Sequence, residues 1–401
     1  MKIIDRKKYM NQLILLNNTP DIKVITGIRR CGKSVLMKEY IKYLQQQESD
    51  INIVEINLQE LEYDQLKEYH MLHQYVLEHY VENKHNVLFI DEVQLCDKFE
   101  MAINSLHTKG IFDIYLTGSN AFLLSSDLAT LFTGRVMRVE VYPFSFSEYL
   151  EYFSGDADLE SAFDEYVRSG GFPGSYIYAD EKTRFDYIKD VYQTILLRDL
   201  VQKYNVRNKE EMQRIAEFMM DNVANLLSPN NICDALNTNG SAITRKTVSK
   251  YITYFENAFL FYGAKRYDLK GKKYLKTNQK YYLCDSSLRY AMLGTRNMDF
   301  GRIYENIVYL ELLRRGYEVY VGKLYKKEID FVAIKQSEKV YIQVSDDISN
   351  NKTFKREYEP LLSIGDAYPK IIIARTRHES YTYEGILIID IVVWLCRDKG
   401  D

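Results

Sequence analysis

The chain has 401 residues, of which 46% are hydrophobic and 27% charged, and its 53 basic and 56 acidic residues leave a formal net charge of −3. This length allows about two to four domains with sizeable cores, while the balanced charge excludes a molecule-wide field that would attract nucleic acid or a membrane surface. The five cysteines are scattered and form no C-x-x-C pair, which argues against a disulfide framework and against a zinc site. The N-terminus lacks the apolar core of a signal peptide, and the most apolar stretch, residues 386–395, is too short to span a bilayer. We therefore expect a cytoplasmic protein without a membrane partner.

The first expected strand and helix enclose a glycine-rich loop. Residues 22–26 are typical of a short strand, residues 34–46 carry apolar side chains at helical spacing, and residues 27–34 between them match the phosphate-loop pattern G-x-x-x-x-G-K-[ST]. The glycines allow a turn that points backbone N–H groups at phosphate oxygens, and the helix N-terminus adds partial positive charge. Lys33 is expected to reach the β- and γ-phosphates, and Ser34 to bind Mg²⁺. The predicted nucleotide-binding residues of this loop are Gly27, Ile28, Arg29, Arg30, Cys31, Gly32, Lys33, Ser34 and Val35.

Apolar runs of strand length alternate with helical patterns up to about residue 145. This alternation is typical of a parallel sheet with helices on both faces. Residues 87–90 form a continuous apolar run, as expected for a central strand that is buried on both faces. The expected strands are residues 22–26, 51–57, 87–90, 114–117 and 136–141.

The strand at residues 87–90 ends in two acids, Asp91 and Glu92. A carboxylate at the end of a buried strand, downstream of a phosphate loop, is where Mg²⁺ is held, so Asp91 is expected to join Ser34 in the metal site. Glu92 is placed to polarise an attacking water as the general base. Without the loop upstream, the pair would be interpreted as a solvent-facing acidic strand end. The predicted catalytic residues are Lys33, Asp91 and Glu92.

Two more polar segments adjoin the later strands. The strand at residues 114–117 ends in three polar residues, Thr117, Ser119 and Asn120, and one of them is expected to form a hydrogen bond to the γ-phosphate or to the attacking water. Arg135 directly precedes the strand at residues 136–141. Two interpretations of Arg135 stay open: an arginine finger that faces the nucleotide of a neighbouring subunit, and a surface salt bridge.

The ordered set of motifs resembles the prokaryotic AAA+ ATPases whose core is followed by a C-terminal domain of unknown function. The motifs are the loop at 27–34, the acids at 91–92, Thr-Gly-Ser-Asn at 117–120, Gly-Arg at 134–135, Pro-Phe-Ser-Phe at 143–146 and Gly-Gly-Phe-Pro at 170–173. The resemblance covers essentially the full chain. It implies an AAA+ core over residues 1–146, with ATP as the nucleotide and Mg²⁺ as its metal ion, and a helical lid over residues 147–205. Arg198, in a helix expected over residues 183–204, is either a nucleotide-sensing arginine or part of a helix salt bridge.

Residues 206–299 have the pattern of a winged helix. Helical patterns at 232–236 and 244–255 have helix–turn–helix spacing, and two strand patterns follow them. The turn region between these strands, residues 265–280, holds seven basic residues, Lys280 among them, against Asp268 alone. Either this surface binds DNA, or the winged helix contacts a protein and the basic hairpin is merely solvated. The predicted nucleic-acid contacts are Arg245, Lys246, Lys250, Lys270, Lys272, Lys273 and Lys276.

Residues 300–401 resemble the PD-(D/E)XK nuclease fold. Glu305 on an amphipathic helix and Asp330 on a strand match two positions of that family's metal site, whereas Gln343 and Ser345 stand where the family has glutamate and lysine. A site without one carboxylate and without its cation is expected to hold Mg²⁺ weakly and to have lost cleavage. If a metal ligand has moved, the available acids are Glu328, Asp346 and Asp347.

The fold class expected from these patterns is α/β: a P-loop NTPase sheet with a helical lid, a winged helix and a small nuclease-like α/β domain. The expected function is Mg²⁺-dependent ATP binding and hydrolysis coupled to a C-terminal region that binds DNA or protein. The alternatives are a slow nucleotide-gated sensor that docks a protein partner and an ATP-regulated nuclease. A homo-oligomer is also compatible with the sequence, which indicates neither the target nor the pathway.

Overall fold

The computed structural model describes residues 2–118, 132, 134–153, 158–237, 243–271, 273–295 and 299–397, apart from the side chains of residues 276 and 277. The chain divides into two compact units, Met1–Pro143 with Arg198–Tyr204, and Phe144–Leu197 with Asn205–Asp401. Among the helices of the described residues, none combines the length and the apolar character needed to cross a membrane.

The first unit is built on a parallel sheet, as predicted. Its described strands have the order β2-β3-β4-β1-β5, and every neighbouring pair is parallel. Strand β4 therefore lies between β1, which precedes the glycine-rich loop, and β3, which ends at Asp91. The elements are α1 (Lys7–Leu15), β1 (Ile22–Thr26), α2 (Lys33–Gln47), β2 (Ile51–Asn57), α3 (Tyr69–Glu78), β3 (His85–Asp91), α4 (Phe99–Lys109), β4 (Asp113–Thr117) and β5 (Val136–Glu140).

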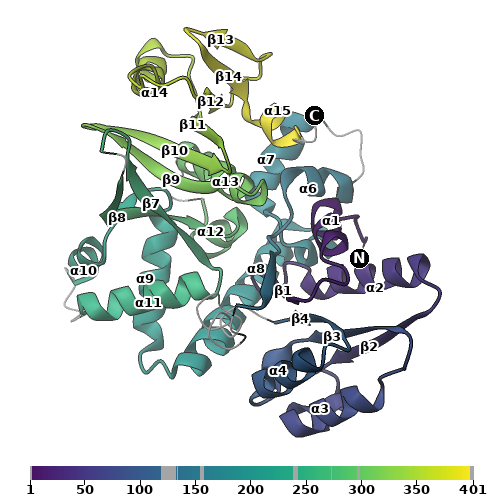
Figure 1. Cartoon of the computed structure of the whole chain (residues 1–401). Coiled ribbons are helices and arrows are strands. Elements are labelled where there is room, and N and C mark those ends of the chain that lie inside the picture. The colour runs from purple at the N-terminus through teal and green to yellow at the C-terminus, as the bar shows by residue number, and fades with distance from the viewer. Residues whose placement is uncertain are drawn as a thin grey trace. The chain divides into compact units, whose positions relative to one another are not determined.

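Helices cover both faces of this sheet, because successive strand residues point to opposite faces. Leu88 and Ile90 of β3 belong to a buried cluster with residues of α3 and α4. Phe89, between them, packs instead against Tyr40 of α2, with 6.1 Å between ring centroids. Figure 1 shows α2 on one side of the strands and α3 and α4 on the other. This two-sided burial explains the continuous apolar run at residues 87–90.

The second unit begins with three helices, α6 (Phe146–Phe153), α7 (Leu159–Ser169) and α8 (Glu181–Thr194). Helix α8 continues as a π-helical segment, Ile195–Gln202, where the sequence predicts one uninterrupted helix. Although the chain on both sides belongs to the second unit, Arg198–Tyr204 belongs to the first. The chain thus connects the two units covalently at three places, residues 143–144, 197–198 and 204–205.

The glycines after α7 have a packing role. Gly170 has φ 65°, and an added Cβ would overlap the carboxylate of Asp285. That carboxylate accepts a hydrogen bond from the backbone N–H of Gly171 (2.6 Å) and another from the N–H of Ser287 (3.0 Å) at the start of α12. Burial raises the pKa of Asp285, and these hydrogen bonds oppose the rise. The Gly-Gly pair therefore lets the backbone approach a buried helix cap.

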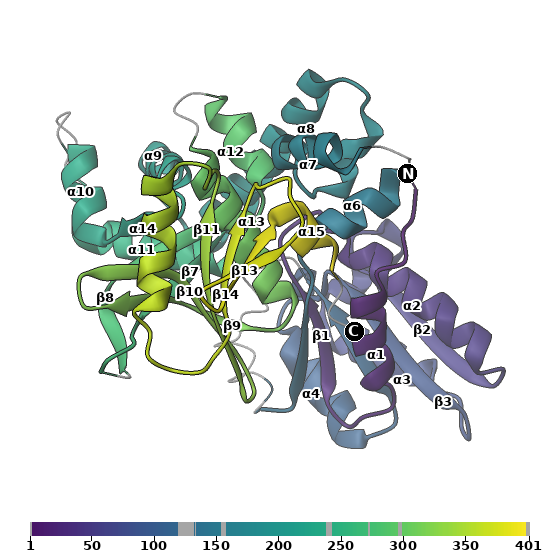
Figure 2. The ribbon, with the colours of Figure 1, turned by 90° about the horizontal axis from the view of Figure 1, so that it is seen from above.

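The remaining strands of the second unit form one continuous sheet. In the described residues its order is β13-β14-β12-β11-β10-β9-β7-β8-β6. The sheet therefore combines strands from both sides of the domain boundary predicted at residue 299. The join is the parallel pairing of β7 with β9, from Arg266 opposite Val321 to Asp268 opposite Lys323. Figure 2 shows β9, β10 and β11 side by side in this sheet. The elements are α9 (Lys209–Asp221), β6 (Leu226–Leu227), α10 (Pro229–Asn237), α11 (Arg245–Asn257), β7 (Phe261–Asp268), β8 (Lys273–Leu283), α12 (Ser286–Leu293), α13 (Phe300–Arg314), β9 (Glu318–Leu324), β10 (Lys327–Lys335), β11 (Glu338–Ser345), α14 (Asn351–Leu362), β12 (Lys370–Ala374), β13 (Tyr381–Tyr383), β14 (Ile386–Asp390) and α15 (Ile391–Cys396).

Helices α13 and α14 pack on opposite faces of this sheet. Phe331 of β10 contacts Tyr309 of α13, with 5.9 Å between ring centroids. The next residue, Val332, lies in a buried cluster with Leu361 of α14. Since adjacent strand residues point to opposite faces, the end of β10 near Asp330 has a helix on either side.

Candidate nucleotide site and second polar site

The glycine-rich loop between β1 and α2 has a tight conformation. Gly27 has φ 135°, and an added Cβ would overlap the carbonyl oxygen of Val141. Gly32, with φ 101°, is the N-cap of α2. The buried Lys33 ammonium donates hydrogen bonds to the carbonyl oxygens of Gly27 (2.9 Å) and Ile28 (3.0 Å) and so lies across the loop. A lysine and the N-terminus of a 15-residue helix are therefore together at the end of β1.

The other predicted loop residues differ in exposure. Arg30 is exposed and has φ 63°, while Ser34 and Val35 are half-buried in the first turn of α2. Cys31 is buried, and its thiol donates to the carbonyl oxygen of Val141 (3.2 Å). The Ser34 hydroxyl is thus near the surface of the loop, as a ligand to a bound metal ion would need to be.

Arg6 anchors the loop, and sequence reasoning missed it. Its guanidinium is 6% exposed and donates to the carbonyl oxygens of Cys31 (3.0 Å) and Tyr142 (2.9 Å). These bonds tie the loop to the segment that follows β5. The sequence gives little signal for this role, because Arg6 lies in an N-terminal run of charged residues 25 positions before Cys31.

Asp91 is the last residue of β3 and Glu92 follows it, while Thr117 is the last residue of the neighbouring strand β4. Both acids are buried, at 5% and 8% exposure. The Thr117 hydroxyl donates to the Asp91 carboxylate and accepts from the backbone N–H of Glu92 (3.3 Å). Glu92 has φ 56°, a left-handed conformation that is uncommon for residues other than glycine and is often found at functional sites. Its carboxylate also accepts a hydrogen bond from the Gln94 amide.

The predicted catalytic residues share one edge of the sheet. Strands β1, β3 and β4 are parallel, so the loop after β1, the acids after β3 and Thr117 at the end of β4 all lie at the carboxyl ends of strands. The Ser34 hydroxyl and the Asp91 carboxylate are oxygen donors, which suit Mg²⁺. In the described part of the chain, no group of three or more histidines, cysteines or acids could hold a metal ion by itself.

Arg29 connects the loop to the π-helical segment. Its guanidinium forms two hydrogen bonds with the Asp199 carboxylate, Nε to Oδ2 at 3.1 Å and Nη2 to Oδ1 at 3.2 Å. The two side chains are 12% and 5% exposed. Burial lowers the pKa of Arg29, but the Asp199 carboxylate outweighs this effect, so the pKa lies above its ordinary value. The neighbouring Arg198, a candidate nucleotide sensor, is exposed.

The remaining predicted nucleotide contacts are Asn120 and Arg135. Asn120 lies outside the described residues. Arg135 is exposed, and its backbone carbonyl accepts a hydrogen bond from the N–H of Ile22 (2.9 Å) at the start of β1. The two interpretations of Arg135 both stay open.

Comparisons with known proteins agree with this architecture. A family model described as an AAA domain matches residues 19–150, and a model of a domain of unknown function (DUF8612) matches residues 160–299. An uncharacterized protein of Haemophilus influenzae is 40% identical over 398 residues, which cover 98% of each chain. The chain belongs to the AAA family of P-loop ATPases. An uncharacterized protein of Methanocaldococcus jannaschii is 29% identical over 360 residues, covering 86% of this chain and 79% of its own.

A solved structure supports the same fold. The Walker-type ATPase of Pyrococcus abyssi superposes with a TM-score of 0.51, covering 72% of this chain and 95% of its own. Its sequence identity is 16%, so the similarity shows the fold alone.

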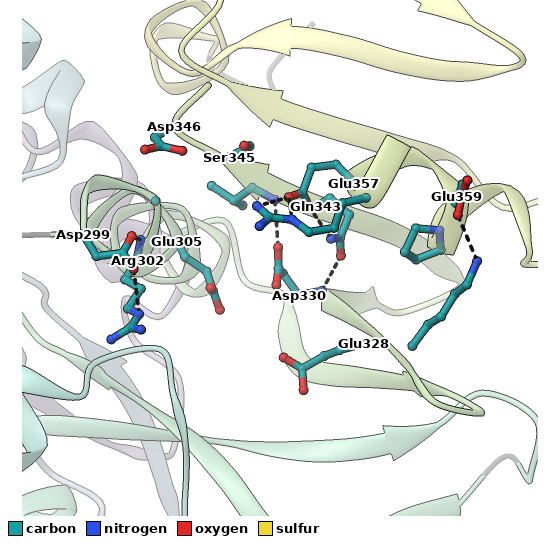
Figure 3. A pocket seen from close by; sticks show the side chains of 15 residues that line it. Asp299, Arg302, Glu305, Glu328, Asp330, Gln343, Ser345, Asp346, Glu357 and Glu359 are labelled. Carbon is teal, nitrogen blue, oxygen red and sulfur yellow. Dashed lines mark hydrogen bonds and ion pairs between the residues drawn. The ribbon is translucent and has the colours of Figure 1, made fainter. Parts of the chain in front are cut away.

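The second unit of this AAA protein holds another polar site, around a cavity of about 520 Å³. The predicted residues Glu305 of α13, Asp330 of β10 and Gln343 of β11 line it (Figure 3). The Gln343 amide is engaged at both ends: its oxygen accepts from the backbone N–H of Asp330 (2.7 Å), and its nitrogen donates to Glu357 of α14 (2.8 Å). Ser345 also lines the cavity, and its hydroxyl donates to the carbonyl oxygen of Asp347 (3.2 Å).

Lys280 of β8 reaches into this site, which corrects its assignment to the exposed basic turn. Its ammonium lies 2.8 Å from Glu305 Oε1, 3.0 Å from Glu328 Oε1 and 3.4 Å from Asp330 Oδ1, and its side chain is 6% exposed. The expectation that the site has no cation is therefore wrong, because a strand distant in sequence supplies one. The strand pattern of β8 does not indicate these partners, because Glu305 lies 25 residues and Asp330 lies 50 residues further along the chain.

Burial and ion pairing have opposing effects on the pKa values of Glu305 and Lys280. Burial raises the pKa of Glu305 to about 7, against the opposing effect of the Lys280 charge. Tyr282 also donates a hydrogen bond to Glu305 Oε1 (2.6 Å). Burial disfavours the Lys280 charge, but the three carboxylates outweigh it and raise the pKa of Lys280, so the ammonium stays charged.

The predicted nucleic-acid contacts are partly in place. Arg245, Lys246 and Lys250 are exposed on α11, and Lys270 and Lys273 are exposed at the turn between β7 and β8. Lys272 and the side chain of Lys276 lie outside the described residues.

Aromatic side chains accompany the basic residues of this hairpin. The Lys270 ammonium lies 4.7 Å from the ring centroid of Tyr325, which is 66% exposed. Tyr274, 57% exposed, packs beside Tyr320 with 5.0 Å between ring centroids. Exposed lysines of this turn thus lie beside exposed tyrosine rings.

Proposed function

We propose that this chain is an Mg²⁺-dependent ATPase that couples its nucleotide state to a nucleic-acid-binding C-terminal unit. The observation that carries the proposal is the shared sheet edge, where Lys33 and the helix N-terminus lie with Asp91 and Glu92. The loop binds the phosphates, and Lys33 exchanges its two carbonyl partners for the β- and γ-phosphates.

Each acid then has one task. Asp91, oriented by the Thr117 hydroxyl, would hold the metal ion together with Ser34. When bound, Mg²⁺ would neutralise charge that develops on the phosphates. Glu92, oriented by Gln94, accepts the proton of the attacking water. This division of tasks uses only groups that are buried or half-buried at the same edge.

The coupling runs through Arg29. This residue belongs to the phosphate-binding loop, and its buried partner Asp199 belongs to a segment whose neighbours on both sides lie in the second unit. A change at the loop therefore acts on a stretch of chain that is covalently continuous with the second unit. The π-helical geometry of Ile195–Gln202 supports a functional role, because π-helical turns are rare and occur frequently at functional sites.

The second unit supplies the binding surface. Its order of α9, β6, α10, α11 and the β7–β8 hairpin supports the predicted winged helix. The exposed basic residues of α11 and of the hairpin turn, with Tyr274 and Tyr325 beside them, suit a phosphate backbone and its bases. The competing candidate, a slow sensor that docks a protein, uses the same surface without DNA.

The order of α13, β9, β10, β11, α14 and β12 supports a nuclease-like fold for the end of the chain. Cleavage is not part of the proposed function. The Gln343 amide is held at both ends by Asp330 and Glu357, so it does not serve as a metal ligand.

Steady-state ATP hydrolysis with and without DNA tests the proposal. Lys33→Ala should abolish tight ATP binding, since the loop loses its cation. Glu92→Gln should retain binding but lower turnover about 100-fold or more, because an amide cannot accept the proton of water. Glu82→Gln, which changes an exposed carboxylate of the same unit, is the control and should hydrolyse ATP normally. Parental turnover in Glu92→Gln would contradict the assigned base, while slow turnover that is indifferent to DNA would favour the sensor.

A further inference from the structure

The position of Lys280 at the second polar site has a consequence beyond ATP hydrolysis. We propose that the Lys280 ammonium takes the place of a divalent metal ion between Glu305, Glu328 and Asp330, so that this site is held together without metal and cuts no phosphodiester. Figure 3 shows these three carboxylates converging on one region from α13 and β10. Lys280 comes from β8 and approaches all three.

The geometry is that of a central cation. An ammonium has three N–H donors, and among the described residues Lys280 has three carboxylate partners, at 2.8, 3.0 and 3.4 Å. A Mg²⁺ or Ca²⁺ ion bound by the same oxygens would lie about 2.0–2.6 Å from each of them. The nitrogen already occupies that central position. Two cations cannot share it, so the residues do not fit a metal ion while Lys280 is present.

The other polar groups around the carboxylates are also engaged by the chain. Tyr282 donates to the same Glu305 oxygen as Lys280, and the backbone N–H of Val344 donates to Asp330 Oδ2 (2.9 Å). Arg356 pairs with Glu357, whose carboxylate also accepts from Gln343. Both carboxylate oxygens of Asp330, and one each of Glu305 and Glu328, therefore have protein donors.

The same arrangement disfavours a phosphodiester substrate. Carboxylates outnumber cations in the lining of the cavity, which comprises Asp299, Glu305, Glu328, Asp330, Asp346, Glu357 and Glu359 against Arg302, Lys327 and Arg356. A bridging metal ion would normally overcome that repulsion. Here the central cation is an ammonium whose donors are already committed to carboxylates, so it cannot also orient a phosphate.

Removing the lysine should expose a latent metal site. In Lys280→Met, a side chain of similar length without charge leaves three carboxylates facing one another, and an added cation relieves their repulsion. We expect nucleotide-free Lys280→Met protein to bind one more Mn²⁺ ion than the parent does. The affinity for Mn²⁺ at this site should be at least 10-fold higher in the variant than in the parent, measured by electron paramagnetic resonance of free Mn²⁺. Mn²⁺ should also raise the melting temperature of this variant more than that of the parent. Adding Asp330→Asn to Lys280→Met should remove both effects.

The control is Lys352→Met, which removes an exposed lysine of the same unit and should gain no Mn²⁺ site. The parent protein provides a test that does not depend on the folding of Lys280→Met. If it binds Mn²⁺ with high affinity in a manner that Asp330→Asn eliminates, the proposal is wrong. Metal-dependent DNA cleavage by the parent that Lys280→Met abolishes would also overturn it and would make Lys280 a catalytic lysine. ATP binding should be unchanged in all these variants, which separates this proposal from the ATPase proposal.

Discussion

The pair formed by Arg29 and Asp199 gives the sharpest test of coupling. Two hydrogen bonds join the side chains, at 3.1 and 3.2 Å, and the side chains are only 12% and 5% exposed. Asp199→Asn leaves the Arg29 guanidinium buried without its counter-charge. Breaking a buried pair in this way costs about 3 kcal/mol of folding free energy, which is roughly 150-fold in the folding equilibrium constant.

A double-mutant cycle with Arg29→Met and Asp199→Asn isolates the interaction itself. We expect a coupling energy of about 2 kcal/mol in the free energy of unfolding, measured by denaturant titration followed by circular dichroism. The control cycle uses Lys67 and Asp64, whose atoms are closer, at 2.7 Å, but whose side chains are 38% and 65% exposed. That pair should give about 0.5 kcal/mol or less, because solvent screens it. Burial, not distance, is thus predicted to set the difference.

The same cycle run with Mg²⁺ and ATP tests the functional role of the pair. Nucleotide binding raises the stability of every variant that binds it, but it also offers Arg29 a second anionic partner in the phosphates. We therefore expect the coupling energy between Arg29 and Asp199 to fall by about 1 kcal/mol or more when ATP is bound. A coupling energy that ATP leaves unchanged would refute transmission through this pair. A value below about 0.5 kcal/mol without ATP would refute the buried interaction.

Two further outcomes concern the second unit. Lys270→Glu combined with Lys273→Glu should weaken DNA binding. It should also reduce the slope of log binding constant against log salt concentration by about 0.9 for each phosphate that the protein no longer neutralises, whereas charge reversal on α8 should leave this slope unchanged. An unaltered slope in the hairpin variant would contradict DNA binding by this surface. Burial raises the pKa of Glu256 on α11 to about 7 from an ordinary value of 4.5, so the folded state holds this proton more tightly than the unfolded state does. The contribution of this proton to the free energy of unfolding is fully present below pH 4.5 and is lost as the pH rises through about 7. Thermal melts between pH 4 and 8 should therefore show a smaller decline in Glu256→Gln than in the parent, and equal declines would contradict a raised pKa.

The first unit could be predicted because its signals are local. The expected strand at residues 22–26 coincides with β1, and the helical spacing at residues 34–46 lies within α2. Strands buried on both faces give continuous apolar runs, and the loop pattern fixes the order strand, loop, helix. Even here a buried charge escaped notice: Lys23 within β1 is fully buried and pairs with Asp113 at the start of β4. Its partner lies 90 residues away.

The parts that could not be predicted depend on pairings between distant segments. The parallel pairing of β7 with β9 merges the expected hairpin and the last domain into one sheet, and neither strand pattern indicates its neighbour. Arg6, Asp199 and Lys280 each gain their role from a partner 25 or more residues away. Glu305 and Asp330 were expected to meet, and both contact Lys280, but the strand that supplies this lysine could not be derived from periodicity.

A comparison of Lys33 with Lys280, both buried, shows how the acceptors of an ammonium decide what it can do. Lys33 is held by two backbone carbonyls, which are neutral dipoles, and each such bond contributes on the order of 1 kcal/mol. Phosphate oxygens carry full charge and are stronger acceptors, so exchanging the carbonyls for them is favourable. Lys280 is held by three carboxylates, and its departure would leave buried negative charges without compensation. Lys33 is therefore suited to follow a ligand that arrives and leaves, whereas Lys280 is suited to stay in place.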